Sequence, residues 1–163
     1  RLTDKRLSLR HLCWNVPSLG KPRLLGIAMQ AEHASAEARR AAPVLAVFDG
    51  RELQLPVSYG DRHVGYAGDI SPALQGGFVL SSNQAGRAML WHPDRASDLP
   101  SVIELPESYA LSAWPGPGAT GGVLCATALG LVRWHPHAQP LLLPWPEPMA
   151  LDNHWCLLRE SDT

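Results

Sequence analysis

Residues 76–93 read GGFVLSSNQAGRAMLWHP, and residues 121–136 repeat the same pattern as GGVLCATALGLVRWHP. In both stretches two glycines open an apolar run, a turn follows, and a second apolar run ends in Trp-His-Pro. The tryptophans Trp91 and Trp134 are 43 residues apart, and Phe48 ends a similar apolar run another 43 residues before Trp91. Short apolar runs between glycine and proline turns predict β-strands and hairpins. A repeat of this length is typical of the four-stranded blade of a β-propeller.

Composition agrees with an all-β fold. The chain has 163 residues with 14 Gly and 15 Pro, which favours many short strands joined by turns. Only residues 31–42, rich in Ala, Glu and Arg, have a helical composition. The net charge of −1 gives no electrostatic basis for binding nucleic acid, and no apolar run approaches the roughly 20 residues of a membrane span. We therefore expect an all-β protein with no nucleic-acid partner and no membrane span.

The repeats divide the chain into four-stranded units. We expect one partial β-propeller over residues 1–163, with blade 1 at about 7–56, blade 2 at about 66–106, blade 3 at about 109–145 and a closing strand at about 150–158. These three to three and a half blades cannot close a ring, because propellers have about four to eight. We expect another part of a parent chain, or a second copy of this chain, to complete a ring of about seven blades.

Six polar residues are candidates for a site in the central channel, which the innermost strands of a propeller line. His11 and Asp69 fall on the first strands of blades 1 and 2, and His154 falls on the closing strand; the flanking candidates are Arg10, Asp152 and Asn153. Imidazole and carboxylate groups suit a metal ion, with His11 and His154 as its candidate ligands. Arg10 and His11 suit a small anion equally well. A structural alternative is that these side chains bind backbone groups and join neighbouring blades.

The remaining histidines are interpreted structurally. The tryptophan of each Trp-His-Pro segment is expected to pack between blades, and the following His-Pro to begin a turn. His33 and His137 are expected in solvated loops, and His63 in a polar loop between blades.

The sequence gives no support to nucleophilic catalysis. It contains no GxSxG, no HExxH and no cysteine flanked by cationic residues. Cys13, Cys125 and Cys156 form no CxxC pair, and each is expected to act as a small buried hydrophobic residue.

Four segments carry a resemblance to a known family. Residues 7–12, LSLRHL, resemble a Leu-Ser-Ile-Arg-His-Leu segment, and residues 26–30, GIAMQ, are similar to a Gly-Met-Gln segment. Residues 65–70, GYAGDI, are similar to Gly-Tyr-Val-Gly-Ser-Val, with Asp69 in place of the serine, and residues 152–154 match a terminal Asp-Asn-His. In order and spacing, the chain resembles the bacterial domain-of-unknown-function family 1513 over nearly its whole length.

This resemblance implies a location and a setting, but no activity. Such proteins are propellers of roughly twice this length, exported to the periplasm, often behind a twin-arginine signal, so this chain resembles their carboxy-terminal half. The resemblance also implies association with periplasmic iron-uptake proteins of the imelysin type. We expect an uncharacterised periplasmic propeller with a ligand-binding, protein-binding or scaffold role linked to iron uptake. The alternative is a metal-dependent propeller enzyme, a hydrolase, lactonase or lyase, that uses the central channel.

Overall fold

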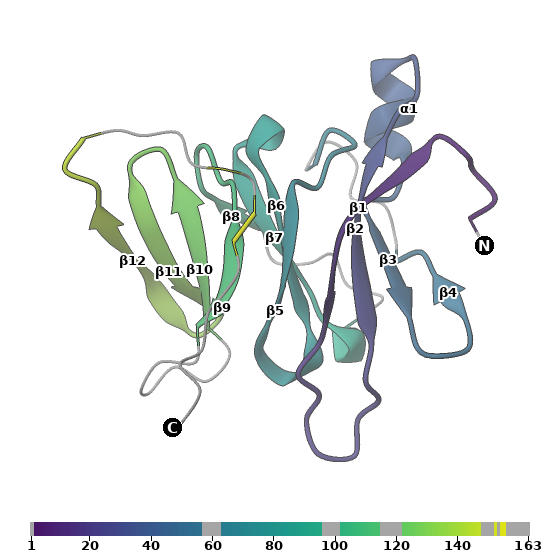
Figure 1. Ribbon diagram of the computed structural model, residues 1–163, viewed down its shortest axis with the longest axis horizontal. Coiled ribbons are helices and arrows are strands. Elements are labelled where there is room, and N and C mark those ends of the chain that lie inside the picture. The colour runs from purple at the N-terminus through teal and green to yellow at the C-terminus, as the bar shows by residue number, and fades with distance from the viewer. Residues whose placement is uncertain are drawn as a thin grey trace.

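Three antiparallel four-stranded sheets make up the molecule, with the strands of each sheet in chain order (Figure 1). The computed structural model describes residues 2–56, 63–95, 102–114, 122–147, 152, 154 and 155. The first sheet contains β1 (Leu7–Trp14), β2 (Leu25–Ala31), β3 (Leu45–Phe48) and β4 (Leu53–Gln54). The second contains β5 (Asp69–Pro72), β6 (Phe78–Ser82), β7 (Arg87–Trp91) and β8 (Val102–Glu104). The third contains β9 (Leu111–Trp114), β10 (Gly122–Thr127), β11 (Gly130–His135) and β12 (Ala138–Pro144).

The prediction of an all-β fold built from four-stranded sheets is confirmed, and the arrangement is consistent with a propeller. Of the predicted closing strand at 150–158, the structure describes residues 152, 154 and 155, none of which lies in a named strand. The other residues of that segment lie outside the described part of the chain, so the closing strand stays a prediction.

One short helix, α1 (Ala36–Ala41), occupies part of the segment predicted to be helical. It begins after Ser35, whose hydroxyl oxygen accepts a hydrogen bond from the backbone N–H of Ala38 at 3.1 Å. It ends before Pro43, since a proline disfavours helical backbone at the residue that precedes it. The helix is shorter than predicted because β2 continues through Ala31. Within the described residues, no helix has the length and apolar character needed to cross a bilayer.

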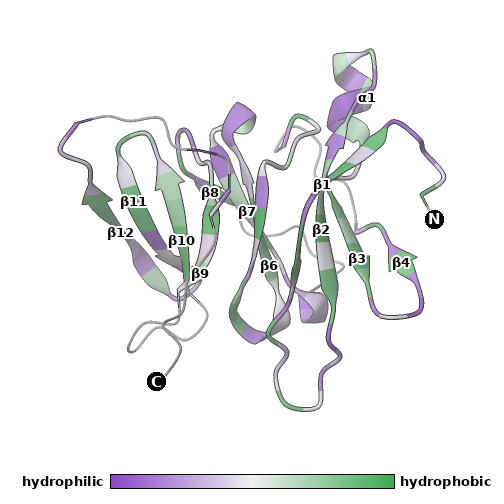
Figure 2. Cartoon of the chain, viewed as in Figure 1, coloured by the Kyte–Doolittle hydropathy of each residue, from purple (hydrophilic) through white to green (hydrophobic). Residues whose placement is uncertain are grey.

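The three sheets lie side by side, with the second in the middle, and their first strands β1, β5 and β9 are neighbours (Figure 1). Both faces of the second sheet are covered, so every residue of β6 is buried. Phe78 and Leu80 pack toward the first sheet, whereas Val79 packs toward the third. Hydrophobic residues accordingly concentrate on the strands (Figure 2).

The two repeated tryptophans lie at the two interfaces between sheets. Trp91 is buried in a cluster with Leu45 of the first sheet and stacks on Phe78 at a centroid distance of 5.8 Å. Trp134 is buried in a second cluster with Val79 of the second sheet. The prediction that these tryptophans pack between repeating units is confirmed.

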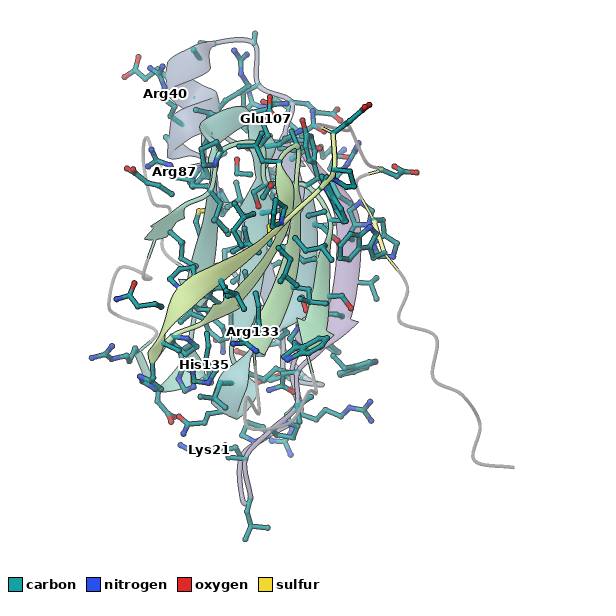
Figure 3. All side chains as sticks on the ribbon, turned by 90° about the vertical axis from the view of Figure 1, so that its left-hand side faces the viewer. Lys21, Arg40, Arg87, Glu107, Arg133 and His135 are labelled. Atoms are coloured by element: carbon teal, nitrogen blue, oxygen red, sulfur yellow. The ribbon has the colours of Figure 1, made fainter. Side chains whose placement is uncertain are left out.

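The outer faces of the first and third sheets carry exposed apolar side chains. On β1, Cys13 packs toward the second sheet, so Leu12 and Trp14 point the opposite way, with 64% and 45% of their surface exposed. Every residue of β12 is exposed, including Leu141, Leu142 and Leu143. Figure 3 looks at the molecule from the side of the third sheet and shows Arg133 and His135 there.

Candidate functional site

A β-bulge in β1 positions the first candidate residue. Leu9 pairs with Met29 and Leu12 pairs with Ile27, so β1 holds two residues, Arg10 and His11, where β2 holds one. A bulge bends its strand and re-aims the side chains within it. His11 is half-buried, and Arg10 beside it is exposed.

Asp69 opens β5 and is completely buried. Its Oδ2 accepts a hydrogen bond from the backbone N–H of Leu111 in β9 at 2.8 Å, and its Oδ1 accepts one from the N–H of Ile70 at 2.8 Å. Its own N–H donates to the hydroxyl oxygen of Ser81 in β6 at 3.0 Å. The carboxylate therefore joins the first strands of the second and third sheets.

His154 completes the cluster from a distant part of the chain. Its Nδ1 lies 3.2 Å from Asp69 Oδ1, and its ring stacks on that of His11 with 4.9 Å between centroids and 18° between planes. The potential ligand atoms of the three residues all lie within 4.8 Å of one another. The side chain of His154 is 56% exposed, so this central cluster of His11, Asp69 and His154 is open to solvent on one side.

Three of the six predicted site residues thus come together. Arg10 and Asp152 are exposed sequence neighbours of the cluster, and Asn153 lies outside the described residues. The sequence contains no signal for the bulge at His11 or for the contact between Asp69 and Leu111, because both depend on how strands pair and how sheets meet.

The electrostatics of the central cluster follow from the burial of Asp69. Burial raises the pKa of its carboxyl above the usual value, and the hydrogen bonds from Leu111, Ile70 and His154 offset part of that effect. A buried carboxylate of this kind is stabilised by a positive charge close to it.

Two thiols lie near the cluster. Burial, reinforced by the negative charge of Asp69, raises the pKa of Cys13 to about 12. Burial likewise raises the pKa of Cys125 to about 11, partly offset by the hydrogen bond to Ser108, whose Oγ lies 2.8 Å from its Sγ. Both thiols are free, Cys125 is buried and Cys13 is half-buried against the core, while Cys156 lies outside the described residues. The prediction of a small buried hydrophobic residue is therefore confirmed for Cys125.

The central cluster has three chemical capabilities. Two imidazoles and a carboxylate can coordinate a metal ion, hydrogen-bond a small polar ligand, or exchange a proton. The predicted structural alternative also has support, since Asp69 binds the backbone of a neighbouring sheet. The two roles are compatible because a carboxylate offers about four lone-pair positions.

The predictions for the other histidines are partly confirmed. His137 is exposed, as predicted. The prediction for His33 was wrong: it is buried, and its Nε2 lies 2.8 Å from Asp4 Oδ2. His63 lies in a turn between the first and second sheets, as predicted; it is completely buried there, its Nδ1 accepts a hydrogen bond from the N–H of Gly65, and burial lowers its pKa to about 4. The burial of His33 depends on a residue distant in the sequence, Asp4, and the burial of His63 depends on the packing around its turn. The local sequence encodes neither.

Away from the central cluster lies a pocket of about 560 Å³, which was not expected from the sequence. The His-Pro turns of the two repeats meet there, which brings together His92, Asp94, Pro136 and His137. The predicted turn after the first tryptophan is confirmed, because a short 3₁₀ helix begins at Pro93. The sequence repeat could have predicted that the two His-Pro turns meet, because equivalent turns of adjacent units lie at the same end of their sheets.

Comparison with known proteins gives a family. A comparison with curated proteins and one with solved structures each found no match. A family model described as a protein of unknown function, DUF1513, matches residues 1–158, which include all three residues of the central cluster. The match covers nearly the whole chain, and the chain therefore belongs to the DUF1513 family.

Proposed function

We propose that this chain is part of a periplasmic β-propeller that binds a ligand at its centre. The observation that carries the proposal is the convergence of His11, Asp69 and His154, whose donor atoms lie within 4.8 Å of one another. Binding sites combine a few converging polar groups with a rigid scaffold. Here the rigid part is Asp69, which two backbone N–H groups hold in place.

The exposure of His154 favours binding over a purely structural role. Asp69 already accepts hydrogen bonds from Leu111 and Ile70, so the link between sheets exists without either imidazole. His154 leaves 56% of its side chain in solvent and therefore adds little buried contact. An exposed imidazole and a half-buried one beside a buried carboxylate are better explained by an incoming ligand.

Completion of the ring is part of the same proposal. Three sheets are fewer than the roughly four to eight that close a propeller. The outer face of the first sheet exposes Leu12 and Trp14, and the edge of the third sheet exposes Leu141 and Leu143. Exposed apolar surface of this kind marks an interface. We propose that the amino-terminal half of the same protein, or a second copy, covers these faces and gives a ring of about seven blades.

The compartment and the biological setting rest on the resemblance of the sequence to exported proteins associated with iron uptake. We propose that the protein acts in the periplasm beside iron-uptake proteins of the imelysin type. Cell fractionation tests the compartment. Recovery of the protein with the cytoplasmic fraction would contradict it.

Native mass spectrometry of the full-length protein tests the binding function. The protein is purified under non-denaturing conditions so that a ligand bound in the cell is retained for mass spectrometry. Thermal shifts are then measured with phosphate, small carboxylates and divalent metal ions. We expect a bound species and a thermal shift in the wild type and in the exposed control His137→Ala, and neither in His154→Ala. Absence of any bound species in the wild type, or an undiminished one in His154→Ala, would overturn the proposal.

One observation favours an enzyme as the second candidate. Burial raises the pKa of Asp69, and this carboxyl lies within hydrogen-bond distance of the accessible His154. Such a pair suits acid–base chemistry in a hydrolase, lactonase or lyase. Turnover that disappears in Asp69→Asn while ligand binding survives would support this candidate, and ligand binding with no turnover of ester, lactone or glycosidic substrates would contradict it.

A further inference from the structure

We infer that the ligand of the central cluster is a first-row divalent transition-metal ion, bound by one nitrogen each from His11 and His154 and one oxygen of Asp69. The inference rests on the proposed central binding site and names the chemical class of its ligand.

The separation of the donor atoms suits such an ion. Metal–nitrogen and metal–oxygen bonds to zinc are about 2.0–2.2 Å long, which places pairs of ligand atoms roughly 3–4 Å apart. The three donors of the cluster already lie within 4.8 Å of one another, and two of them, His154 Nδ1 and Asp69 Oδ1, are 3.2 Å apart. The remaining adjustment falls on His154, which must turn out of its stack on His11; its side chain is 56% exposed, whereas Asp69 is completely buried.

The charge of the site also favours a cation. Asp69 is completely buried and carries a negative charge when it ionises, which is costly unless a positive charge lies beside it. A divalent ion between the carboxylate and the two imidazoles supplies that charge. The backbone N–H groups of Leu111 and Ile70 orient the carboxylate, as outer-shell hydrogen bonds do in metal sites.

The mixture of donors determines the class of metal. Magnesium and calcium ions prefer sites made of oxygen atoms, whereas imidazole nitrogen suits zinc, iron, cobalt, nickel and copper ions. Three protein ligands leave at least one coordination position for water or for a bound molecule. Because these ligands come from three separate segments, the ion binds only the folded arrangement and stabilises it.

Metal titration of the chelator-treated full-length protein tests the inference. Zn²⁺ binding is followed by calorimetry, and Co²⁺ binding by visible absorption. We expect one tightly bound equivalent of either ion, no competition from Mg²⁺ or Ca²⁺, and affinity weakened at least about tenfold in His154→Ala and in His11→Ala. Two single variants are used so that a folding defect in one leaves the other informative.

The turn between β11 and β12 provides the matched control. The rings of His135 and His137 lie 5.6 Å apart there and form a pair of neighbouring histidines outside the central cluster. We expect His137→Ala to bind as tightly as the wild type, and the metal to raise the melting temperature of the wild type and of His137→Ala but not of His154→Ala.

Three results would overturn the inference: no metal binding by the wild type, equal binding by the wild type and both cluster variants, or loss of binding in His137→Ala alone. If a phosphate or carboxylate ligand binds in a His154-dependent manner and no metal does, the proposed function stands and this inference fails. If neither kind of ligand binds, both fail.

Discussion

We expect the buried His63 to make the stability of the protein depend on pH. Its side chain is completely buried in the turn before β5, where Nδ1 accepts a hydrogen bond from the N–H of Gly65 at 2.9 Å. Burial lowers its pKa to about 4, whereas an unfolded chain has a histidine pKa of about 6.5. The unfolded state therefore binds the proton more readily as pH falls through this range. We expect the free energy of unfolding to be greatest above pH 6.5 and to fall toward pH 4, by about 3 kcal/mol at most.

Urea unfolding at pH 7.5, 6.5 and 5.5 measures this dependence. His63→Asn is the informative variant, because its side-chain oxygen can still accept from the Gly65 N–H but cannot titrate near neutral pH. We expect it to flatten the slope between pH 6.5 and 5.5, and the exposed control His137→Asn to keep it. An unchanged slope in His63→Asn would assign the pH dependence to another group.

Gly26 is required by the ring of Phe78. A Cβ at position 26 would lie 2.7 Å from the nearest ring carbon of Phe78, which packs on β2 from the second sheet. We expect Gly26→Ala to lower the free energy of unfolding by about 1–3 kcal/mol, since overpacking forces the two sheets apart. In the double variant Gly26→Ala, Phe78→Leu, the free energy of unfolding measured with urea should fall by less than the sum of the losses in the two single variants. Strict additivity would show that the methyl group and the ring do not meet.

At the scale of elements, a buried amide fastens the first hairpin to the second sheet. Asn15 follows β1; its Nδ2 donates to the carbonyl of Gly76 at 3.1 Å, and its Oδ1 accepts from the N–H of Leu24 at 2.8 Å. Asn15→Ala would leave both backbone groups without this partner, so we expect a loss of about 2 kcal/mol in the free energy of unfolding.

The exposed ion pair between Lys21 and Asp94, with 2.7 Å between Nζ and Oδ1, provides the comparison, because it joins the same hairpin to the second sheet. We expect Lys21→Ala to cost clearly less free energy of unfolding than Asn15→Ala, since solvent screens such pairs. If urea unfolding showed that Asn15→Ala and Lys21→Ala lower the free energy of unfolding equally, the buried amide would not be the stronger of the two contacts.

The strands were largely predictable because their signal is local. The apolar run that ends at Trp91 predicts a strand, and β7 covers Arg87–Trp91. The placement of His11 and Asp69 on first strands followed from the same repeat. The bulge at His11 and the bond from Leu111 to Asp69 could not be predicted, because they arise from pairing between strands and contact between sheets. The burial of His33 was missed for the same reason, since its partner Asp4 lies 29 residues away.

For the whole molecule, the exposed apolar side chains on the outer face of the first sheet predict that the chain associates with itself. We expect this chain, expressed alone, to self-associate in sedimentation experiments, because Leu12 and Trp14 lie exposed on one outer face. The double variant Leu12→Ser, Trp14→Ser should shift the population toward the monomer. Leu19→Ser, at a fully exposed position in the hairpin between β1 and β2, should leave it unchanged. A stable, dilute wild-type monomer of 17.7 kDa would contradict the proposed completion of the ring.

The placement of the two described thiols has a practical consequence. Cys13 packs into the contact between the first and second sheets, and Cys125 into the contact between the second and third. Because burial raises the pKa of Cys13 to about 12 and that of Cys125 to about 11, we expect both to react slowly with an alkylating reagent until the surrounding sheets separate, the fully buried Cys125 more slowly than the half-buried Cys13. The chain thus has a native thiol at the contact between the first and second sheets and another at the contact between the second and third. The alkylation rates of Cys13 and Cys125 would therefore report how fast neighbouring sheets separate, without an engineered cysteine.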